Sequence, residues 1–207
     1  MPTGTPASKQ ELEHFVAYAR ERKILLCHDN PYSMIFRAKE PLSVLSIAGA
    51  KEVAIELNSL SKSFNMAGWR MGWVAGASEY LRTILKVKSN VDSGMFKPMM
   101  LAAAKALALR DEWFDALDLE YAKRRSVVCQ MLDLLNCSYS KTQQGLFIWA
   151  KIAENEQSSE ALVDRLLQEH CVFITPGTIF GEQGRRYVRI SLCNEEEVFQ
   201  KALERIS

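Results

Sequence analysis

The stretch from Leu57 to Gly76, LNSLSKSFNMAGWRMGWVAG, constrains the fold more than any other part of this 207-residue chain. An apolar run at residues 53–57 leads into it, and a second apolar run covers residues 71–75. Short apolar runs bounded by polar and glycine residues predict strands. The chain is therefore expected to hold a short polar segment between two strands.

Four polar side chains in this segment share a chemistry, and they are Ser59, Ser61, Lys62 and Arg70. A lysine amine condenses with a carbonyl, which is a recognised form of covalent catalysis. Serine hydroxyls and an arginine fork are good partners for a phosphate. The group therefore suits a ligand that carries both an aldehyde and a phosphate. Taken alone, Lys62 is more simply a lysine of a buried strand.

A second polar group follows the apolar run at residues 24–27 and contains Asp29 and Tyr32. Because the run comes after a predicted helix, we expect a buried parallel strand. Ligands bind at the carboxyl ends of strands in open α/β sheets, which makes the two side chains candidates for a binding site. For these residues alone, an Asx-Pro turn over residues 28–32 is the alternative. His28 is expected to be a hydrogen-bonded neighbour rather than a catalyst.

The pattern S-x-S-K followed by G-W-R-x-G resembles the cofactor-lysine motif of the class I/II aminotransferases, which are pyridoxal-phosphate enzymes of fold type I. Four further motifs occur in the family's order: P-T-G at 2–4, D-x-x-Y at 29–32, P-G-x-x-F-G at 176–181 and R-I-S at 189–191. The residues around Lys62 look closest to those of the alanine, aspartate and diaminopimelate branches of this family. The resemblance covers essentially the whole chain.

The resemblance implies a role for each residue of the two polar groups. Lys62 would bind the cofactor aldehyde and move a proton between the substrate carbon and the cofactor. Asp29 would bind the protonated ring nitrogen, which makes the ring a better electron sink, and Tyr32 would bind the ring oxygen. The implied ligands of the cofactor phosphate are Ser59, Ser61 and Arg70.

A strand predicted at residues 187–192 carries the implied substrate ligand, Arg189. By the resemblance, its guanidinium binds the α-carboxylate of the amino-acid substrate. Such two-point binding fixes orientation as well as charge. Arg189 alternates with Val188 and Ile190 inside the strand, where an unpaired charge would be costly. A plain surface arginine is therefore the less favoured alternative.

The expected fold class is α/β: the C-terminal part of a fold type I large domain, with a mixed and mostly parallel sheet, and then a small α+β domain. Residues 1–118 are assigned to the first and 119–207 to the second, joined by a long helix at about 112–135. Capping residues and hydrophobic spacing predict other helices at about 8–22, 78–88, 99–108, 158–169 and 195–206. Further strands are predicted at 145–150 and 171–175.

The composition excludes several other classes of partner. A formal net charge of +1 gives no electrostatic case for nucleic acid or an anionic membrane. The five cysteines show no C-x-x-C spacing, so we expect reduced, mostly buried thiols in a cytoplasmic protein. The three histidines are scattered, and no metal site is expected. A homodimer is implied by the family, whose sites are shared between subunits.

Together with the resemblance, the motifs predict exchange of an amino group between an α-amino acid and a 2-oxo acid. Met1 stands where the family's N-P-T-G turn has its asparagine, so the chain resembles roughly the C-terminal half of such an enzyme. We therefore expect weak or no activity from this chain alone. Two alternatives stay open: a C–S β-lyase of the same fold, which releases pyruvate and ammonia, and a non-catalytic binding or dimerisation fragment.

Overall fold

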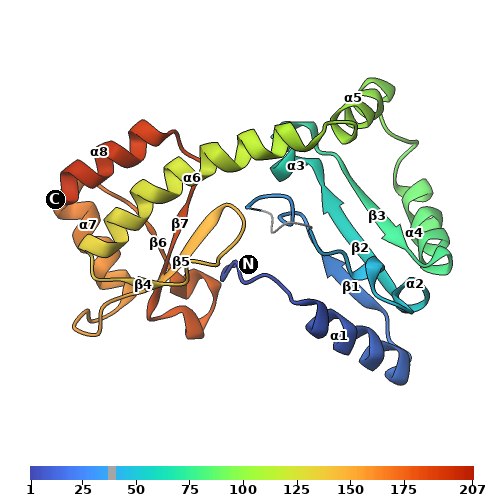
Figure 1. Cartoon of the computed structure of the whole chain (residues 1–207), viewed down its shortest axis with the longest axis horizontal. Helices are drawn as coiled ribbons and strands as arrows, with labels where there is room; N and C mark the ends of the chain where they lie inside the picture. The colour runs from blue at the N-terminus through green and yellow to red at the C-terminus, as the bar shows by residue number, and fades with distance from the viewer. Residues whose placement is uncertain (37–40) are drawn as a thin grey trace. The chain divides into compact units, whose positions relative to one another are not determined.

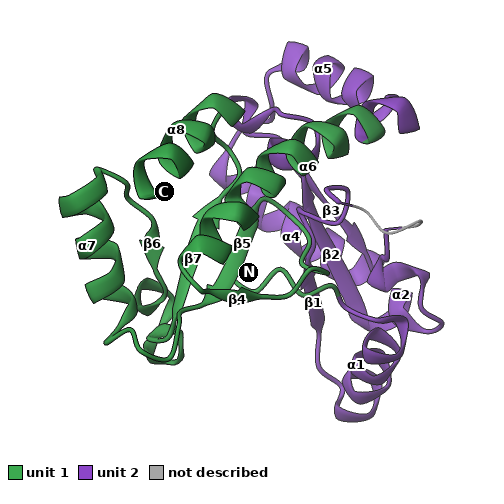
Figure 2. Ribbon diagram, turned by 60° about the vertical axis from the view of Figure 1, so that its left-hand side comes forward, with its two compact units in different colours: residues 1–6, 115–207 green, residues 7–114 purple. Residues whose placement is uncertain are grey.

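Two sheets organise residues 1–36 and 41–207, which are the residues that the computed structural model describes. One sheet lies in a unit formed by residues 7–114, and the other in a unit formed by residues 1–6 and 115–207 (Figure 2). The first sheet is mixed, and the second is antiparallel. The expected class, α/β with a mixed sheet followed by an α+β part, is confirmed.

The mixed sheet has the strand order β1-β2-β3 (Figure 1), with β1 at Leu26–Asp29, β2 at Ala54–Ser59 and β3 at Gly72–Gly76. β1 and β2 are parallel, as predicted, and β3 is antiparallel to β2. The predicted strand start at Ile24 is wrong. The Ile24 amide instead donates to the Ala19 carbonyl at 3.0 Å, so this residue completes the end of the preceding helix.

Helix α1 (Lys9–Arg22) begins with the capping box that the sequence predicts. The Ser8 hydroxyl accepts from the Glu11 amide at 3.2 Å, and the Glu11 carboxylate accepts from the Ser8 amide at 2.7 Å. These two bonds satisfy amides that a helix start leaves without partners. One face of α1 packs against η1 (Val44–Ser46) and α2 (Ala50–Val53), which precede β2. The core formed there consists of Leu12, Val16, Val44, Ile47, Ala50 and Ala54.

Four further elements belong to the same unit: α3 (Leu60–Ser63), η2 (Ala67–Trp69), α4 (Ser78–Val91) and α5 (Lys97–Leu107). A small core joins α3 to α5 and consists of Leu60, Met71, Ala103 and Ala106. Helix α4 differs, because none of its residues, all of which are described, is buried. Its Leu85, Val87 and Val91 are 64%, 62% and 79% exposed. This helix therefore leaves apolar side chains open to contact.

The antiparallel sheet has the strand order β4-β5-β7-β6. Its strands are β4 (Ser138–Tyr139), β5 (Phe147–Lys151), β6 (Thr175–Pro176) and β7 (Tyr187–Ser191). The strand predicted at 171–175 is wrong over all but its last residue. Cys171 ends the preceding helix with a left-handed backbone (φ 53°), and the Val172 amide donates to the Leu166 carbonyl at 3.1 Å. Amides that close a helix cannot pair in a sheet, so β6 starts at Thr175.

Three helices complete the unit of residues 1–6 and 115–207 or lead into it: α6 (Asp111–Leu134), α7 (Ser159–His170) and α8 (Glu196–Ile206). All three agree with the helices predicted from the sequence. Ser158 caps α7 by accepting a 3.1 Å hydrogen bond from the Ala161 amide. Within the ranges that the structure describes, no helix combines the length and the apolar character needed to cross a membrane.

The prediction of mostly buried cysteines is wrong. All are free thiols, with Cys137 buried and Cys129 half-buried, while the exposed ones are Cys27, Cys171 and Cys193. Cys27 lies on the exposed face of β1, because successive residues of a strand point to opposite faces. Cys171 is exposed because it ends α7.

Candidate active site

Parallel pairing of β1 with β2 brings two of the predicted motifs to one edge of the mixed sheet. Leu26 pairs with Ala54 and Asp29 pairs with Leu57, so both strands end on the same side. Just beyond β1, the Asn30 amide donates to the Leu57 carbonyl at 2.9 Å. The D-x-x-Y motif therefore leaves β1 beside the S-x-S-K motif that leaves β2.

Lys62 lies in α3, the single turn that directly follows β2. Ser59 caps this turn, since its hydroxyl accepts from the Ser61 amide at 3.1 Å. The Lys62 side chain is half-buried, and its Nζ lies 5.8 Å from the centroid of the Tyr32 ring. An ammonium at about 6 Å or less from an aromatic ring is attracted to it. This contact joins the two motifs that the sequence predicts to act together.

The end of α3 is fixed by the start of α6. Trp113 Nε1 donates to the carbonyl of Ser63 at 3.0 Å, and Ser63 is buried. Phe64 packs edge-on against Phe114, with ring centroids 5.5 Å apart. Lys62 is thus carried by a backbone segment that is anchored to β2 before it and to α6 after it.

Arg70 reaches back toward the start of α3. Its Nη1 donates to the Ala67 carbonyl at 3.0 Å and to the Ser61 hydroxyl at 3.5 Å. The Arg70 backbone is left-handed, with φ at 53°, a conformation that costs an L residue about 1 kcal/mol or more. Ser59, Ser61 and Arg70 therefore present hydroxyls and a guanidinium in one region, a donor set that suits an anion.

Asp29 ends β1 on the exposed face of that strand. Its neighbours His28 and Asn30 are half-buried, and alternation along the strand directs them to the opposite face. His28 Nδ1 lies 3.2 Å from Oε2 of Glu56, which confirms that this histidine is a hydrogen-bonded neighbour. Asp29 is left facing outward at the edge where the parallel strands end.

Glu56 is a buried carboxylate that no sequence motif singles out, and it is 8% exposed. Its Oε2 accepts from the Ser43 hydroxyl at 2.7 Å and from the Val44 amide at 3.0 Å. Burial raises the pKa of the Glu56 carboxyl, but hydrogen bonds from His28, Ser43 and Asn30 outweigh it and hold the pKa below its ordinary value. One signal could have found this residue: an acid inside an apolar run, where an unpaired charge is costly.

Arg189 lies in β7 against two aromatic rings. Its Cζ is 4.2 Å from the centroid of the Phe147 ring and 4.1 Å from that of the Phe180 ring. Phe180 belongs to the P-G-x-x-F-G motif, so the two C-terminal motifs meet here. Trp149 extends the group, because it stacks on Tyr187 at 5.1 Å and meets Phe180 edge-on at 5.7 Å. The arginine is therefore held by ring packing within the antiparallel sheet.

Two glycines hold the P-G-x-x-F-G motif in its conformation. A Cβ added at Gly177 would overlap the carbonyl oxygen of Gly184, and one added at Gly184 would overlap the carbonyl oxygen of Gly177. Any side chain at either position would push the two segments apart. The close backbone approach fixes η3 (Gly177–Phe180), and the last residue of η3, Phe180, lies against Arg189.

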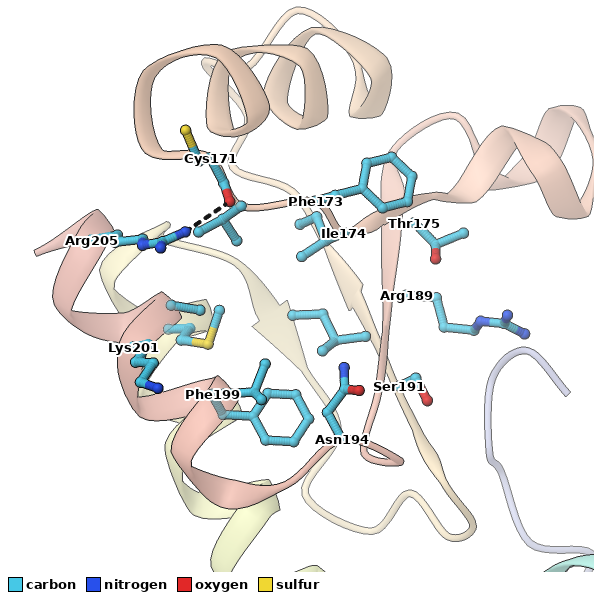
Figure 3. A pocket seen from close by; sticks show the side chains of 15 residues that line it. Cys171, Phe173, Ile174, Thr175, Arg189, Ser191, Asn194, Phe199, Lys201 and Arg205 are labelled. Carbon is cyan, nitrogen blue, oxygen red and sulfur yellow. Dashed lines mark hydrogen bonds between the residues drawn. The ribbon is translucent and has the colours of Figure 1, made fainter.

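A cavity of about 320 Å³ lies between residues 171–175, β7 and α8 (Figure 3). Figure 3 shows the Arg189 side chain extending away from α8, which carries Lys201 and Arg205. Arg205 Nη1 donates to the Cys171 carbonyl at 3.2 Å. Among the described residues that line this cavity, Arg189 is the one that the sequence predicts to have a role.

The six residues predicted to bind the cofactor all lie in the unit of residues 7–114. Side-chain contacts join two pairs of them, Lys62 with Tyr32 and Arg70 with Ser61. The predicted substrate arginine belongs to the other unit. The site residues therefore fall into two groups, each with its own supporting contacts.

The sequence matches the family described as aminotransferase class I and II over residues 1–206. The chain belongs to this family. It is 40% identical to the LL-diaminopimelate aminotransferase of Natranaerobius thermophilus and 38% identical to that of Gloeobacter violaceus, each over 206 residues. Both alignments cover 99% of this chain and 53% of the relative, so this aminotransferase chain spans about half the length of the curated relatives it matches.

Solved aminotransferase structures resemble the fold of this chain at lower sequence identity. The apo structure of BacF from Bacillus subtilis has a TM-score of 0.90 at 33% identity, covering 99% of this chain and 52% of that one. An aromatic aminotransferase from Pyrococcus horikoshii OT3 has a TM-score of 0.88 at 30% identity, covering 99% and 56%. The expected fold, part of a fold type I large domain followed by an α+β domain, is confirmed.

The residues at the edge of the mixed sheet fit pyridoxal phosphate, which this family is known to use. Lys62 offers an amine for the aldehyde, and Asp29 offers a carboxylate for the ring nitrogen. The 3.5 Å contact between Arg70 and Ser61 places a cation and a hydroxyl together, as a phosphate dianion requires. The donor set therefore contains a partner for each polar part of the cofactor.

Proposed function

We propose that this chain is a cytoplasmic, pyridoxal-phosphate-dependent aminotransferase polypeptide that exchanges an amino group between an α-amino acid and a 2-oxo acid. The observation that carries the proposal is the contact between Lys62 and Tyr32, with 5.8 Å from Nζ to the ring centroid, where β1 and β2 end. An amine that binds an aldehyde and a phenol that binds the neighbouring ring oxygen would serve one ligand there. Membership of the family supports the same reaction class.

The residues beside the strand ends would divide the chemistry among them. When bound, pyridoxal phosphate supplies an aldehyde for the substrate amine and a ring that withdraws electrons from the substrate α-carbon. Lys62 would hold the aldehyde through Nζ; once the substrate amine has replaced it there, the freed amine would carry the proton to and from the substrate α-carbon. Asp29 keeps the ring nitrogen protonated, because a carboxylate stabilises a neighbouring cation. Tyr32 donates its phenol hydrogen to the ring oxygen.

Ser59, Ser61 and Arg70 would hold the phosphate. Arg70 contributes the positive charge, and the Ser61 hydroxyl 3.5 Å away contributes a further donor. Charge-assisted hydrogen bonds of this type are about twice as strong as neutral ones. A fixed phosphate places the ring against Lys62, and such positioning lowers the entropic part of the reaction barrier.

Arg189 would bind the α-carboxylate of the substrate with its guanidinium fork. The rings of Phe147 and Phe180, at 4.2 and 4.1 Å from Cζ, restrict the guanidinium. A side chain that is already ordered loses less entropy when it binds. The names of the curated relatives support LL-diaminopimelate as the first amino donor to test.

Visible absorbance of the purified chain mixed with pyridoxal phosphate tests the proposal. We expect a new band from lysine-bound cofactor, and after borohydride reduction and peptide mapping we expect the adduct on Lys62. Lys62→Ala should remove the adduct. Lys51→Ala, which removes an exposed lysine of α2, should keep it. An absent band, or labelling spread over surface lysines, would overturn the proposal for this chain.

Product analysis with LL-diaminopimelate and other amino donors then identifies the reaction. A new amino acid indicates amino-group exchange, whereas pyruvate with ammonia indicates a C–S β-lyase. Because the chain spans about half the length of its relatives, we expect weak or no turnover from these 207 residues alone. Full turnover by the purified chain would contradict that expectation.

A homodimer is proposed as the assembly, with α4 and the segment after it in the interface. Leu85, Val91 and Phe96 are 64%, 79% and 68% exposed, and a partner chain that covered these apolar side chains would remove them from water. Sedimentation of the wild type and of a Leu85→Asp variant tests the assembly. A wild-type dimer that the substitution dissociates is expected, and a wild-type monomer would overturn it.

A further inference from the structure

Glu56 lies at the centre of a buried polar network on the sheet face opposite Asp29. Its Oε2 accepts from the Ser43 hydroxyl at 2.7 Å and lies 3.2 Å from His28 Nδ1. Its Oε1 lies 3.4 Å from Nδ2 of Asn30. A carboxylate that is 8% exposed is costly to bury unless such partners satisfy it. The network therefore favours one arrangement of these side chains.

The network contacts both chain neighbours of Asp29. His28 precedes it and Asn30 follows it, and both side chains reach Glu56. The Asn30 amide also donates to the Leu57 carbonyl at 2.9 Å, which ties the same residue to the backbone of β2. With the residues on either side held in this way, the Asp29 carboxylate has little freedom to tilt at the sheet edge.

We propose that Glu56 is a positioning residue: through His28 and Asn30 it sets where the Asp29 carboxylate meets the ring nitrogen of the cofactor. This inference deepens the proposed function and rests on it. Glu56 pairs with His28 in the sheet register, so its side chain lies on the face away from Asp29 and acts through these neighbours. The alternative is a purely structural role, in which Glu56 only docks the loop that contains Ser43.

Amide hydrogen exchange tests the inference without any cofactor. Glu56→Gln keeps the shape but removes the charge that the Asn30 side chain contacts. We expect the backbone amide of Asn30, which donates to the Leu57 carbonyl, to exchange about tenfold faster or more, because the residue that carries it is held less firmly. Ser43→Ala is the matched control, because it removes a donor to Glu56 that does not flank Asp29. Its Asn30 exchange should stay within about twofold of the wild type. Equal acceleration in both variants, or in neither, would overturn the inference.

Nitrogen-15-labelled pyridoxal phosphate gives a second readout, because its ring-nitrogen chemical shift reports protonation directly. In Glu56→Gln we expect this shift to move toward that of the unprotonated ring. The dissociation constant of the cofactor should rise about tenfold, as for the loss of one charge-assisted interaction. In an Asp29→Asn background, Glu56→Gln should change neither quantity further, because residues that act through one another are not additive. Additive effects would overturn the inference.

The failure of this inference and the failure of the proposed function give different results. If the wild type shows no lysine-bound cofactor, the proposed function fails and takes the inference with it. If the wild type binds cofactor through Lys62, but Glu56→Gln leaves the ring-nitrogen shift and the Asn30 exchange unchanged, the inference alone fails.

Discussion

The two units of this aminotransferase differ in how completely they bury their apolar side chains. In residues 1–6 and 115–207, fully buried side chains come from both the sheet and the helices: Val128, Leu132, Ile148, Leu162, Leu166, Val188 and Leu192. Residues 7–114 also contain fully buried side chains, such as Val16, Val44 and Leu60, but α4 buries none of its residues and leaves Leu85 and Val91 exposed. The proposed substrate arginine thus rests on a closed core, whereas the proposed cofactor residues rest on a partly exposed sheet.

In the unit of residues 7–114, polar contacts position the proposed cofactor residues. In the other unit, packing positions the proposed substrate arginine. Asp29 is flanked by hydrogen bonds to Glu56, and the turn of Lys62 is anchored by the Trp113 hydrogen bond. Arg189, in contrast, lies against aromatic rings. Packed cores respond to changes of volume, and buried polar networks respond to changes of charge. The contrast can therefore be tested by changing one property at a time.

Truncation of Leu162 should have the largest effect. This leucine of α7 is 0% exposed, and Leu→Ala at such sites costs about 2–5 kcal/mol of unfolding free energy. Leu167→Ala is the matched control on the same helix, where the side chain is 46% exposed. Leu57→Ala lies at the centre of the mixed sheet but is 37% exposed, and we expect about 1 kcal/mol or less. Denaturant unfolding measures all three, and equal losses at Leu162 and Leu57 would remove the contrast between the units.

Alkaline pH should weaken the unit of residues 1–6 and 115–207 through Cys137. Burial raises the pKa of this thiol from about 9 to about 11, so between these values the thiol ionises in the unfolded chain but not in the folded one. Stability that is complete below about pH 9 is therefore lost as pH rises toward 11. At about 1.4 kcal/mol per pKa unit, the loss over these two units is about 3 kcal/mol.

The measurement is the unfolding free energy against pH for the wild type and for Cys137→Ala. The variant should lose less stability over this window, because its unfolded chain releases one proton fewer. An identical slope in both proteins would show that the buried thiol does not couple folding to pH.

Acid should act on the unit of residues 7–114 through Glu56. Burial raises the pKa of this carboxyl, but the hydrogen bonds from His28, Ser43 and Asn30 leave it below the ordinary value of 4.5. A carboxyl with a lowered folded pKa stabilises the protein above that ordinary value, and the stabilisation is lost as pH falls through the folded pKa. The amide protection factors in β1 and β2, which correct for the slower intrinsic exchange in acid, should fall as the pH falls, and less steeply in Glu56→Gln. An unchanged acid response in the variant would exclude Glu56 as its source.

The features that the sequence predicted well depend on neighbouring residues. The capping box at Ser8 and the cap at Ser158 are local signals, and both helices start where these signals place them. The segment that carries Lys62 was recognisable because its residues follow a family motif. The motif could be recognised without knowledge of the fold. The residues that contact it in the structure could not be identified in that way.

The features that the sequence missed depend on contacts between distant residues. Glu56 meets His28 across 28 positions, and this contact follows from strand register, which apolar runs alone do not fix. The strand expected at 171–175 was lost because its amides close α7. The exposure of Cys27 followed from which face of β1 is covered. In each case the sequence gives the residue type. It does not give the contact with a distant residue or segment that sets the environment of that residue.

Replacing Phe180 by leucine should have the smallest effect, and it tests the packing side of the contrast. The substitution keeps an apolar side chain but removes the ring 4.1 Å from Arg189 Cζ, a contact that contributes about 0.5–1 kcal/mol. We expect the Arg189 Nε–Hε proton resonance to shift as the ring current is lost, while the unfolding free energy falls by about 1 kcal/mol or less. Phe173→Leu, at a residue that is 64% exposed in the same unit, should change neither the Arg189 resonance nor the unfolding free energy. If Phe180→Leu leaves the Arg189 resonance in place, that ring does not hold the guanidinium. Positioning in this unit would then depend on Phe147 and the strand itself.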